Sequence, residues 1–407
     1  MRILLLTDNF PPEVNAPASR GFDHAVEWTK MGHKVTVITC HPNFPMGKLY
    51  QGYKNSLYSV EYMKGIKVIR VWTYISANKD FFKRTLDYFS FALTSAIFGL
   101  FVKTDVIIAT SPQFFTAFSG NFLSIVKRKP WIFEVRDLWP DSIVAVGSLN
   151  KKSKIYRILK RFESYFYQSS DAIVVVTDSF KNYILTKHFI HNEKIGVFKN
   201  GIIASHLKTL KTFEIDKLRT SLSINVEKKI VSYIGTHGLA HGLEFILNCA
   251  NNPKIQHIHF LFIGDGAKKI ELIDLKNKLK LTNVTFLDAV PKEEIQQYIE
   301  LSDYALVNLK KSNEFKNVIP SKIFENVAAH KPILLGVEGE SQKIIDNYGV
   351  GICYEPENQN SFIKAIEKIV ELANSKKFID GCVSLTNDFD RKKIANKMMV
   401  FIEKALD

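Results

Sequence analysis

The sequence predicts an α/β protein built from two domains, each with a parallel sheet covered by helices. The chain has 407 residues, which is more than one ordinary hydrophobic core accommodates. Short runs rich in β-branched residues alternate with longer helical patterns, as in βαβ units. The alternation is interrupted after the turn Asn200-Gly201, where a polar stretch runs to about residue 228. We therefore place the domain boundary near residue 200.

The predicted strands form two series of six. The first series is Ile3–Leu6, Val35–Thr39, Val68–Val71, Val106–Ala109, Trp131–Val135 and Ala172–Val176. The second series is Ile230–Ile234, His259–Ile263, Val284–Leu287, Tyr304–Val307, Pro332–Leu335 and Gly351–Tyr354. Strands that end in glycine, at Gly235 and Gly264, indicate a turn into a helix or a ligand-binding loop. The amphipathic segment from about 385 to 407 is expected to pack back on the first domain. The predicted domains are thus 1–200 with this helix, and 201–384.

The composition is that of a soluble globular protein, with 46% hydrophobic and 24% charged residues. The four cysteines are scattered without a CxxC pair, so neither a disulfide framework nor a zinc site is indicated. This usage fits a reducing cytoplasm. The N-terminus is apolar for only five residues and predicts a first strand rather than a signal peptide.

The positive charge is concentrated in the first half of the chain. Residues 1–200 hold 27 Lys and Arg against 15 Asp and Glu, whereas residues 201–407 hold 28 against 26. A basic half implies an anionic partner, which is a nucleic acid, a membrane surface or a phosphorylated substrate. A nucleic acid is the weakest of these, because no RNP motif, zinc finger or basic region with heptads is present.

One apolar segment, Phe89–Val102, favours the membrane surface. It is flanked by Lys79, Lys83, Arg84 and Lys103. As a helix it would extend about 21 Å, short of the roughly 30 Å needed to cross a bilayer. The segment is therefore either a buried core helix or a helix lying in the interface, with its basic flanks on lipid head groups.

The stretch NVIPSKIFENVAAHKPIL, residues 317–334, joins a loop to a helix and carries candidate ligand-binding groups. Ser321 and Lys322 stand at the helix start, where unpaired N–H groups and the helix dipole suit a phosphate. Glu325 follows one turn later and suits a sugar hydroxyl. The alternative is that Ser321 is an ordinary N-cap and Glu325 a solvated side chain.

Together with this helix, other stretches resemble the retaining GT-B glycosyltransferases of family 4, and the resemblance covers essentially the whole chain. TDNFPPEVNAPASR (7–20) resembles the loop after the first strand, which contacts acceptor and donor diphosphate in that family. VFKNGI (197–202), LFIGDG (261–266) and SDYALVNL (302–309) are similar to the interdomain turn and two donor-domain elements. The resemblance implies the GT-B fold: two Rossmann-like parallel-sheet domains facing a cleft.

Two further stretches, TCHPNFPMGKLYQGYKN (39–55) and FEVRDLWPDSIVAVG (133–147), resemble a subgroup that builds O-antigens and capsules. That subgroup includes transferases of N-acetyl-L-fucosamine. The resemblance implies a retaining hexosyltransferase-type enzyme that moves this sugar from UDP to a polyprenyl-pyrophosphate-linked saccharide. Such an enzyme would lie peripherally on the cytoplasmic face of the inner membrane. It would take a UDP-sugar as donor substrate, use no cofactor and bind no nucleic acid.

The resemblance also implies site residues. The expected donor-binding residues are Gly235, Thr236, His237, Gly238, His241, Asp265, Gly266, Lys310, Ser321, Lys322 and Glu325. The expected catalytic residues are Glu325, Asn317 and Lys322, and the expected acceptor-binding residues are Asn15, Ala16, His41, Lys48, Arg136 and Asp137. No carboxylate cluster or DxD-like element is evident, so no metal ion is expected.

The sequence departs from the family pattern at three positions. Many members carry E-x7-E, but the position eight residues before Glu325 is Asn317, which binds hydroxyls without supplying a charge. Thr236 and His241 stand where arginine and lysine are common, which leaves Lys322 and Lys310 as the cations for a diphosphate. Two other functions therefore stay open: a UDP-sugar 2-epimerase on the same architecture, and a non-catalytic degenerate GT-B subunit.

Overall fold

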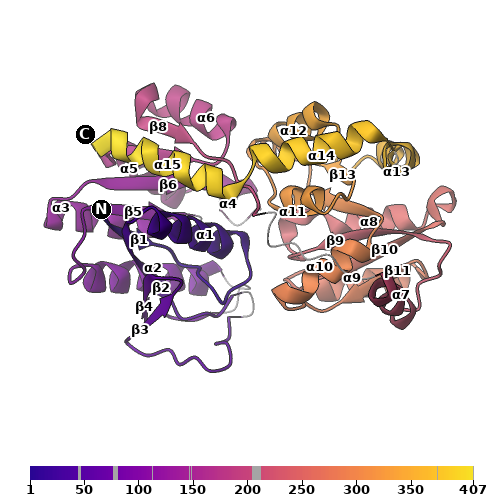
Figure 1. Cartoon of the computed structure of the whole chain (residues 1–407), viewed down its shortest axis with the longest axis horizontal. Coiled ribbons are helices and arrows are strands. Elements are labelled where there is room, and N and C mark those ends of the chain that lie inside the picture. Colours follow the sequence, from indigo (N-terminus) through magenta and orange to yellow (C-terminus); the bar gives the residue numbers. More distant parts are fainter. Residues whose placement is uncertain are drawn as a thin grey trace. The chain divides into compact units, whose positions relative to one another are not determined.

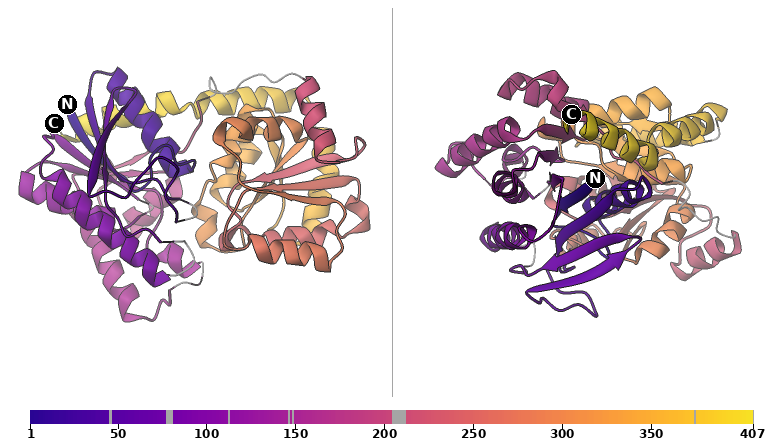
Figure 2. Two further views of the ribbon diagram at one scale, coloured as in Figure 1. Left: turned by 90° about the horizontal axis from the view of Figure 1, so that it is seen from below. Right: turned by 60° about the vertical axis from the view of Figure 1, so that its left-hand side comes forward.

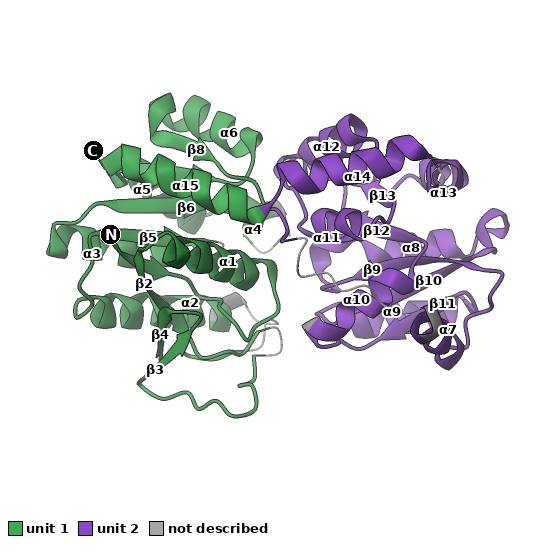
Figure 3. Cartoon of the chain, viewed as in Figure 1, with its two compact units in different colours: residues 1–200, 391–407 green, residues 201–390 purple. Residues whose placement is uncertain are grey.

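The computed structural model describes residues 1–44, 47–76, 81–111, 113–145, 147, 149–203, 212–373 and 375–406. The chain divides into two compact units, which Figure 3 shows in different colours. Unit 1 comprises Met1–Asn200 and Arg391–Asp407, and unit 2 comprises Gly201–Asp390. Each unit is built on a mainly or wholly parallel sheet with helices, which confirms the predicted fold class.

Unit 1 contains an eight-stranded sheet, and most of its strands are labelled in Figure 1. Its strands are β1 (Arg2–Leu6), β2 (Lys34–Cys40), β3 (Tyr58–Met63), β4 (Ile66–Val71), β5 (Val106–Thr110), β6 (Trp131–Val135), β7 (Ala172–Val175) and β8 (Ile195–Val197). Its helices are α1 (Ala16–Lys30), α2 (Phe81–Gly99), α3 (Thr116–Lys127), α4 (Asp141–Ala145), α5 (Lys154–Ser169), α6 (Asp178–His188) and α15 (Arg391–Leu406), with a 3-10 turn η1 (Asn192–Lys194).

The strands of unit 1 lie in the order β3-β4-β2-β1-β5-β6-β7-β8, and neighbours run parallel except at one edge. There β3 pairs antiparallel with β4. The predicted series lacks β3, because no residue of this strand is buried and its sequence carries no continuous apolar run. An edge strand of this kind is difficult to distinguish from a loop by sequence pattern.

One face of this sheet is covered by α1 and α15, which lie side by side in Figure 1. The indole Nε1 of Trp28 on α1 donates a hydrogen bond of 3.0 Å to the carbonyl of Ala395 on α15. Met398 and Ile402 are fully buried in the same cluster as Ile3 of β1. The C-terminal helix thus packs on unit 1 as expected, but it begins at Arg391 rather than near 385, because residues before 389 form a separate helix of unit 2.

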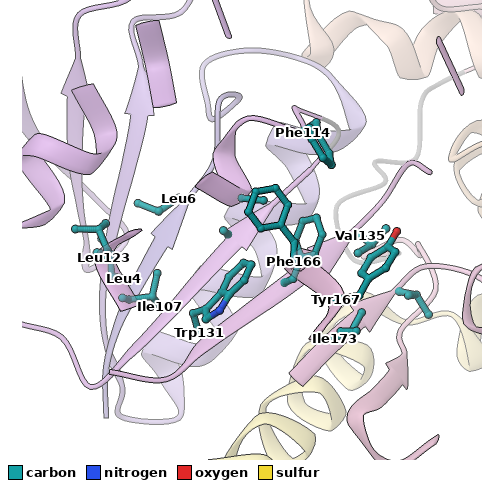
Figure 4. Close-up of a cluster of buried hydrophobic side chains, with 14 of the residues drawn as sticks. Leu4, Leu6, Ile107, Phe114, Leu123, Trp131, Val135, Phe166, Tyr167 and Ile173 are labelled. Carbon is teal, nitrogen blue, oxygen red and sulfur yellow. The ribbon is translucent and has the colours of Figure 1, made fainter. Parts of the chain in front are cut away.

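The other face carries α2, α3 and α5, the purple and magenta helices that lie together in the left view of Figure 2. Their inner side chains close a large apolar cluster, in which Trp131 and Phe166 are shown with the strand residues in Figure 4. The segment predicted as Phe89–Val102 lies mostly within α2, which starts eight residues earlier at Phe81. Phe91 is fully buried, whereas Leu93 is 53% exposed, so the helix packs with one face and exposes the other.

Across the described part of the chain, no helix combines the length and the apolarity that crossing a bilayer requires.

Unit 2 contains a six-stranded sheet in the order β11-β10-β9-β12-β13-β14, and all its neighbours run parallel. Its strands are β9 (Lys229–Ile234), β10 (Ile258–Ile263), β11 (Val284–Leu287), β12 (Tyr304–Asn308), β13 (Ile333–Gly336) and β14 (Gly351–Cys353). Its helices are α7 (Thr212–Ser221), α8 (Leu243–Ala250), α9 (Lys269–Lys278), α10 (Lys292–Leu301), α11 (Lys322–Ala328), α12 (Glu340–Tyr348), α13 (Gln359–Ala373) and α14 (Lys376–Asp388). Short 3-10 turns are η3 (Leu239–His241), η4 (Pro253–Ile255) and η5 (Glu314–Asn317).

Both sheets reverse their winding direction at one place. In unit 1 the first strand, β1, lies between β2 and β5, and in unit 2 β9 lies between β10 and β12. The loops that leave these strands diverge, and ligands of doubly wound sheets bind at such points, beyond the carboxyl ends of the strands. The loop after β9 begins at Gly235, and the loop after β12 contains Lys310. The loop after β1 contains Asp8 and Asn15.

Candidate active site

Two glycine-containing loops of unit 2 pack backbone against backbone at this point. Gly235 N–H donates to the Ile263 carbonyl (2.8 Å), and His237 N–H donates to the Asp265 carbonyl (2.8 Å). A Cβ on Gly264 would lie 2.0 Å from the Gly235 carbonyl oxygen, and φ there is +140°, so only glycine fits. The two loops therefore form one closely packed surface with polar backbone groups.

Lys322, the first residue of α11, lies across this surface. Its Nζ is 3.6 Å from the centre of the Tyr233 ring, a distance at which ammonium and ring attract each other. A Cβ on Gly235 would come within 2.4 Å of Lys322 Cε, so the glycine makes room for the lysine. Burial lowers the pKa of Lys322 to about 7, although Glu325 raises it. The lysine is thus a cation that a bound anion would stabilise.

Two histidines stand beside Lys322, and both are neutral. Burial lowers the pKa of His237 to about 4 and that of His241 to about 3, with Lys322 adding to both effects. The Nδ1 of His241 accepts the N–H of Gly238 at 3.3 Å, which leaves Nε2 as its N–H donor. His237 is fully buried, and both of its ring nitrogens lack a hydrogen-bond partner. Thr236 is exposed, and its carbonyl accepts the hydroxyl of Tyr233.

Lys310 is brought to the same surface by backbone contacts. Its N–H donates to the Ala240 carbonyl (2.9 Å), and the preceding Asn308 donates from Nδ2 to the carbonyl of His241 (2.7 Å). The hydroxyl of Tyr354 donates to Asn308 Oδ1 and holds that amide in place. These contacts fix the start of the loop after β12 against the loop after β9. The predicted second cation therefore lies at the edge of the same loops.

Ser321 and Glu325 lie at the start of α11 and one turn into it. Ser321 occupies the N-cap position of α11 but its side chain makes no capping hydrogen bond, so the ordinary N-cap interpretation is wrong for Ser321, whereas the exposure of Glu325 agrees with a solvated side chain. Glu325 is exposed, and its charge acts on Lys322. Asn317 ends η5, five residues before α11, and is partly exposed. Because α11 has only seven residues, Lys322 rather than the helix dipole supplies most of the positive charge.

Asp265 and Gly266 form a turn. Asp265 Oδ1 accepts the N–H of Gly266 at 2.7 Å, which occupies one carboxylate oxygen locally. A Cβ on Gly266 would lie within 2.9 Å of three backbone atoms of His237. Gly266 thus allows the two loops to meet, and Asp265 keeps one oxygen for other partners.

The acceptor-binding residues predicted in unit 1 lie at several places. Asn15 is the N-cap of α1: Oδ1 accepts the N–H of Ala18, and Nδ2 donates to Asn9 Oδ1 (2.6 Å). Ala16 is the first residue of that helix. His41 is buried, and its Nε2 lies 3.2 Å from the Ser56 carbonyl, whereas Lys48 is exposed. Burial lowers the pKa of His41.

Arg136 and Asp137 follow β6 and are only partly exposed. Arg136 donates to the Pro17 carbonyl (3.3 Å) and has a buried Nε without a partner. Burial lowers its pKa to about 9, and burial raises the pKa of Asp137 to about 6, against hydrogen bonds from Ser142 and Leu138. The charge of Glu134 raises the pKa of Arg136, and the charge of Arg136 lowers that of Glu134, so the arginine lies near a buried carboxylate.

The structure also assembles a group that the sequence analysis missed. Asp8, Glu13 and Asp87 line one pocket of about 150 Å³ in unit 1. Asp87 belongs to α2, and no local pattern links it to the loop after β1, so only the fold reveals the cluster. Among the residues that the structure describes, no group of His, Cys, Asp and Glu is arranged to hold a metal ion.

Two family models match the chain. Residues 22–206 match the model "Glycosyltransferase Family 4", and residues 214–380 match the model "Glycosyl transferases group 1". WcaI of Escherichia coli K12, named for colanic acid biosynthesis, is 24% identical over 383 residues, covering 91% of this chain and 93% of its own. WbjE of Pseudomonas aeruginosa, named as a glycosyltransferase, is 30% identical over 252 residues and covers 60% of each chain.

The fold has solved counterparts. The structure of HepE from Anabaena in complex with UDP-glucose superposes with a TM-score of 0.72 at 14% identity, covering 99% of this chain and all of that one (100%). At this identity the likeness shows the fold alone. The two models between them match most of the chain and support a family 4 glycosyltransferase, and the fold is the two-domain GT-B fold.

Proposed function

We propose that the chain transfers a sugar, N-acetyl-L-fucosamine, from UDP to a polyprenyl-pyrophosphate-linked saccharide in O-antigen or capsule synthesis, with retention. The observation that carries the donor assignment is the position of Lys322 over Gly235 and the ring of Tyr233. A partly buried cation beside packed backbone loops suits a diphosphate whose negative charge grows as it leaves the sugar. HepE, whose fold this chain shares, was solved with UDP-glucose, which supports UDP as the carrier.

In this proposal the other donor residues bind different parts of the nucleotide. His241 offers its Nε2–H, and Lys310 a second positive charge, to the phosphates. Glu325 is exposed one turn into α11 and binds the ribose hydroxyls, because its carboxylate oxygens accept the hydrogen bonds that hydroxyl groups donate. The sugar identity and the retention follow from the resemblance of residues 39–55 and 133–147 to the fucosamine subgroup. WcaI and WbjE are named as glycosyltransferases, and WcaI for colanic acid biosynthesis, which agrees with the proposed transferase activity.

The donor site is tested by UDP binding to the full chain in a calorimeter. We expect micromolar binding that Glu325→Gln weakens at least tenfold, about 1.4 kcal/mol, because the amide loses the charged acceptor for the ribose hydroxyls. Glu367→Gln is the matched control, since Glu367 is exposed on α13 and lies outside the donor loops. Binding that neither substitution changes would contradict the assignment of Glu325. UDP binding without transfer to any lipid-linked saccharide would instead favour the degenerate-subunit alternative.

We also propose that the outer surface of α2, α3 and α5 lies on an acidic membrane. The three helices expose large apolar side chains along this surface: Leu86, Phe89, Leu93 and Ile97 on α2, Phe122, Ile125 and Val126 on α3, and Ile155, Ile158, Phe162 and Tyr165 on α5. Exposed basic residues lie on the same helices or close to their ends in the sequence: Lys83, Arg84, Lys103, Arg128, Lys154, Arg157 and Arg161. Lys79, a predicted flanking residue, lies outside the described residues. Apolar area with a basic border is the pattern of interfacial binding to anionic lipid.

Sedimentation with phosphatidylglycerol-containing vesicles tests this surface. We expect Leu93→Glu to weaken vesicle binding at least about tenfold, because it replaces buried apolar area in the bilayer surface by a charge that anionic lipid repels. Val383→Glu is the control, since Val383 on α14 is similarly exposed, at 50% against 53% for Leu93. Added salt should weaken the binding of the wild type. Equal losses in both variants, or equal binding to neutral vesicles, would refute the proposed surface.

A further inference from the structure

Strand β3 (Tyr58–Met63) forms one edge of the unit 1 sheet, and its outer side pairs with no other strand of the described residues (Figure 1). Just before β3, the carbonyl of Leu57 accepts the N–H of Trp72 at 3.1 Å. Hydrogen-bonded pairs alternate along an antiparallel ladder, so every second residue after Leu57 bonds to β4. The residues between them, whose backbone N–H and C=O groups point away from the sheet, are Tyr58, Val60 and Tyr62.

This edge lacks the features that usually keep other chains away from a strand. Proteins protect open edges with proline, lysine, a bulge or a covering segment. Tyr58–Met63 contains neither proline nor lysine, and its register with β4 is unbroken. Val60 is 44% exposed and Tyr62 is 73% exposed, so no described segment covers them. The one charged residue, Glu61, pairs with Arg70 of β4. The edge is therefore open and suited to pairing with another strand.

The sequence of β3 is complementary to a second, antiparallel copy of itself. When Val60 lies opposite Val60 of the second copy, each Tyr58 lies opposite a Tyr62, and all the outward backbone groups are paired. In this register Glu61 lies opposite Ser59, which is neutral. A shift by one residue sets outward groups against inward ones. A shift by two residues either places the two Glu61 carboxylates opposite each other, which is unfavourable, or leaves Tyr62 beyond the end of the second strand.

The exposed face of β3 adjoins the surface that we propose to meet lipid. The ring centre of Tyr58 lies 5.3 Å from that of Phe98 on α2, and Val60 lies opposite Ile69, which is buried in the same cluster as Phe91 of α2. Opposite residues of antiparallel strands point to the same face, so a two-fold axis perpendicular to the sheet relates the two copies. Both α2 helices then lie on the same side of the joined sheets. One membrane would contact both copies, which favours a second copy as the partner.

We propose that β3 pairs edge to edge with β3 of a second copy of this chain, in an antiparallel register centred on Val60. Two six-residue strands form a small interface, so the pairing is weak in solution. On a membrane the copies are confined to one surface and one orientation, which strengthens it by raising their effective concentration. The pairing depends neither on the proposed transferase activity nor on lipid, so it is tested in solution.

Sedimentation velocity of the full chain at about 100 μM measures the pairing, because a small interface requires a high concentration. We expect a monomer–dimer equilibrium in the wild type that Val60→Lys weakens at least tenfold, because two lysines would face each other across the two-fold axis. Val400→Lys is the matched control, since Val400 is 59% exposed on α15. A wild type that stays monomeric, or a Val60→Lys variant that dimerises like the wild type, would overturn the proposal.

Cysteine cross-linking with diamide tests the register without disturbing the strand. In the proposed register two Val60 Cα atoms lie about 5.5 Å apart, within disulfide range, whereas two Tyr62 Cα atoms are offset by four residues, about 13 Å. We expect Val60→Cys to form disulfide-linked dimers at least tenfold faster than Tyr62→Cys, although Tyr62 is the more exposed residue. The wild type gives the background from its native cysteines, of which Cys353 is partly exposed. Equal rates for the two variants would indicate random collision and refute the register.

Two further measurements separate this inference from misfolding, from lipid binding and from the proposed function. Thermal unfolding of Val60→Lys should match that of Val400→Lys, and if Val60→Lys fails to fold, the two cysteine variants decide. A monomeric wild type whose binding to phosphatidylglycerol vesicles is lost in Tyr62→Glu would mean that the edge meets lipid, and the proposal would fall. UDP calorimetry of Val60→Lys should match the wild type. Absence of UDP binding in every protein, with dimerisation intact, would refute the donor proposal and leave the pairing standing.

Discussion

Replacing Arg20 by methionine should lower the free energy of unfolding of unit 1 by about 3–5 kcal/mol, because it leaves a buried carboxylate without its partner. Arg20 is 1% exposed, and its Nε donates to Glu134 Oε1 at 2.8 Å. The same guanidinium donates to the carbonyls of Phe198 (2.9 Å) and Lys199 (3.0 Å). One side chain therefore joins α1 to β6 and to the last residues of unit 1 before residue 201.

The contribution of Glu134 to the pH dependence of stability should change sign in this variant. In the wild type burial raises the pKa of Glu134, but the charges of Arg20 and Arg136 outweigh burial and leave that pKa below its ordinary value. The ionised Glu134 then stabilises the fold above about pH 4.5, and this contribution is lost as the pH falls through the lower folded pKa. Without Arg20 burial should dominate and raise the pKa, so Glu134 would destabilise the fold progressively as the pH rises.

Urea unfolding followed by tryptophan fluorescence measures this effect in unit 1 alone. All four tryptophans of the chain, Trp28, Trp72, Trp131 and Trp139, belong to unit 1. Adding Glu134→Gln to Arg20→Met should recover at least about half of the loss, because the unpaired charge is gone. Arg2→Met is the control, since the Arg2–Asp105 pair is solvent-exposed and should contribute little. A loss as small as that of Arg2→Met would contradict the assigned role of the buried pair.

The fold was largely predictable because its strands are buried on both faces. Strands such as Val106–Thr110 and Ile258–Ile263 are fully buried and therefore appear in the sequence as continuous apolar runs bounded by turns. The edge strand Tyr58–Met63 contains no buried residue, so its alternating sequence carried no such signal. The start of the last helix at Arg391 could not be predicted from the local sequence, because it depends on which unit each helical turn packs against.

The grouping of the predicted donor residues in the fold was predictable for a related reason. Ser321, Lys322 and Glu325 lie within five consecutive residues, so their spacing places them at one helix start. Gly235 directly follows a buried strand, which places it at the end of that strand. The contact of Lys322 with Tyr233 could not be predicted, because it depends on how the fold brings the first residue of α11 to the end of β9. The carboxyl pocket was missed for the same reason, since Asp8 and Asp87 are brought together only by the packing of α2 on the sheet.

Replacing Lys322 by methionine should weaken UDP binding at neutral pH at least tenfold, about 1.4 kcal/mol. Methionine keeps the aliphatic length that fills the space over Gly235 and Tyr233, so the loss should report the missing charge. Lys322→Arg retains a charge and should bind UDP more tightly than Lys322→Met. Tyr233→Phe keeps the aromatic ring and should change the affinity little. A loss of affinity in Tyr233→Phe as large as in Lys322→Met would point to a collapsed loop instead.

The affinity for UDP should also fall as the pH rises above neutrality. Burial holds the pKa of the free Lys322 at about 7, and a bound diphosphate favours the ammonium and raises that pKa. Binding above pH 7 then requires proton uptake, so the affinity falls by up to about tenfold for each pH unit until the raised pKa is reached. His237 and His241 do not share this effect, since their pKa values of about 4 and about 3 leave them neutral.

Calorimetry in pairs of buffers with different ionisation enthalpies measures this proton uptake directly between about pH 6 and pH 9. The wild type should take up close to one proton above pH 8, whereas Lys322→Arg should take up none, because arginine stays charged throughout this range. The proton uptake that remains in Lys322→Met comes from the ionisation of UDP itself. It is subtracted from the proton uptake of the wild type. Equal proton uptake by the wild type and Lys322→Met would mean that the lysine does not meet the diphosphate. In that case Lys310 would be the remaining predicted cation, and Lys310→Met should then weaken UDP binding instead.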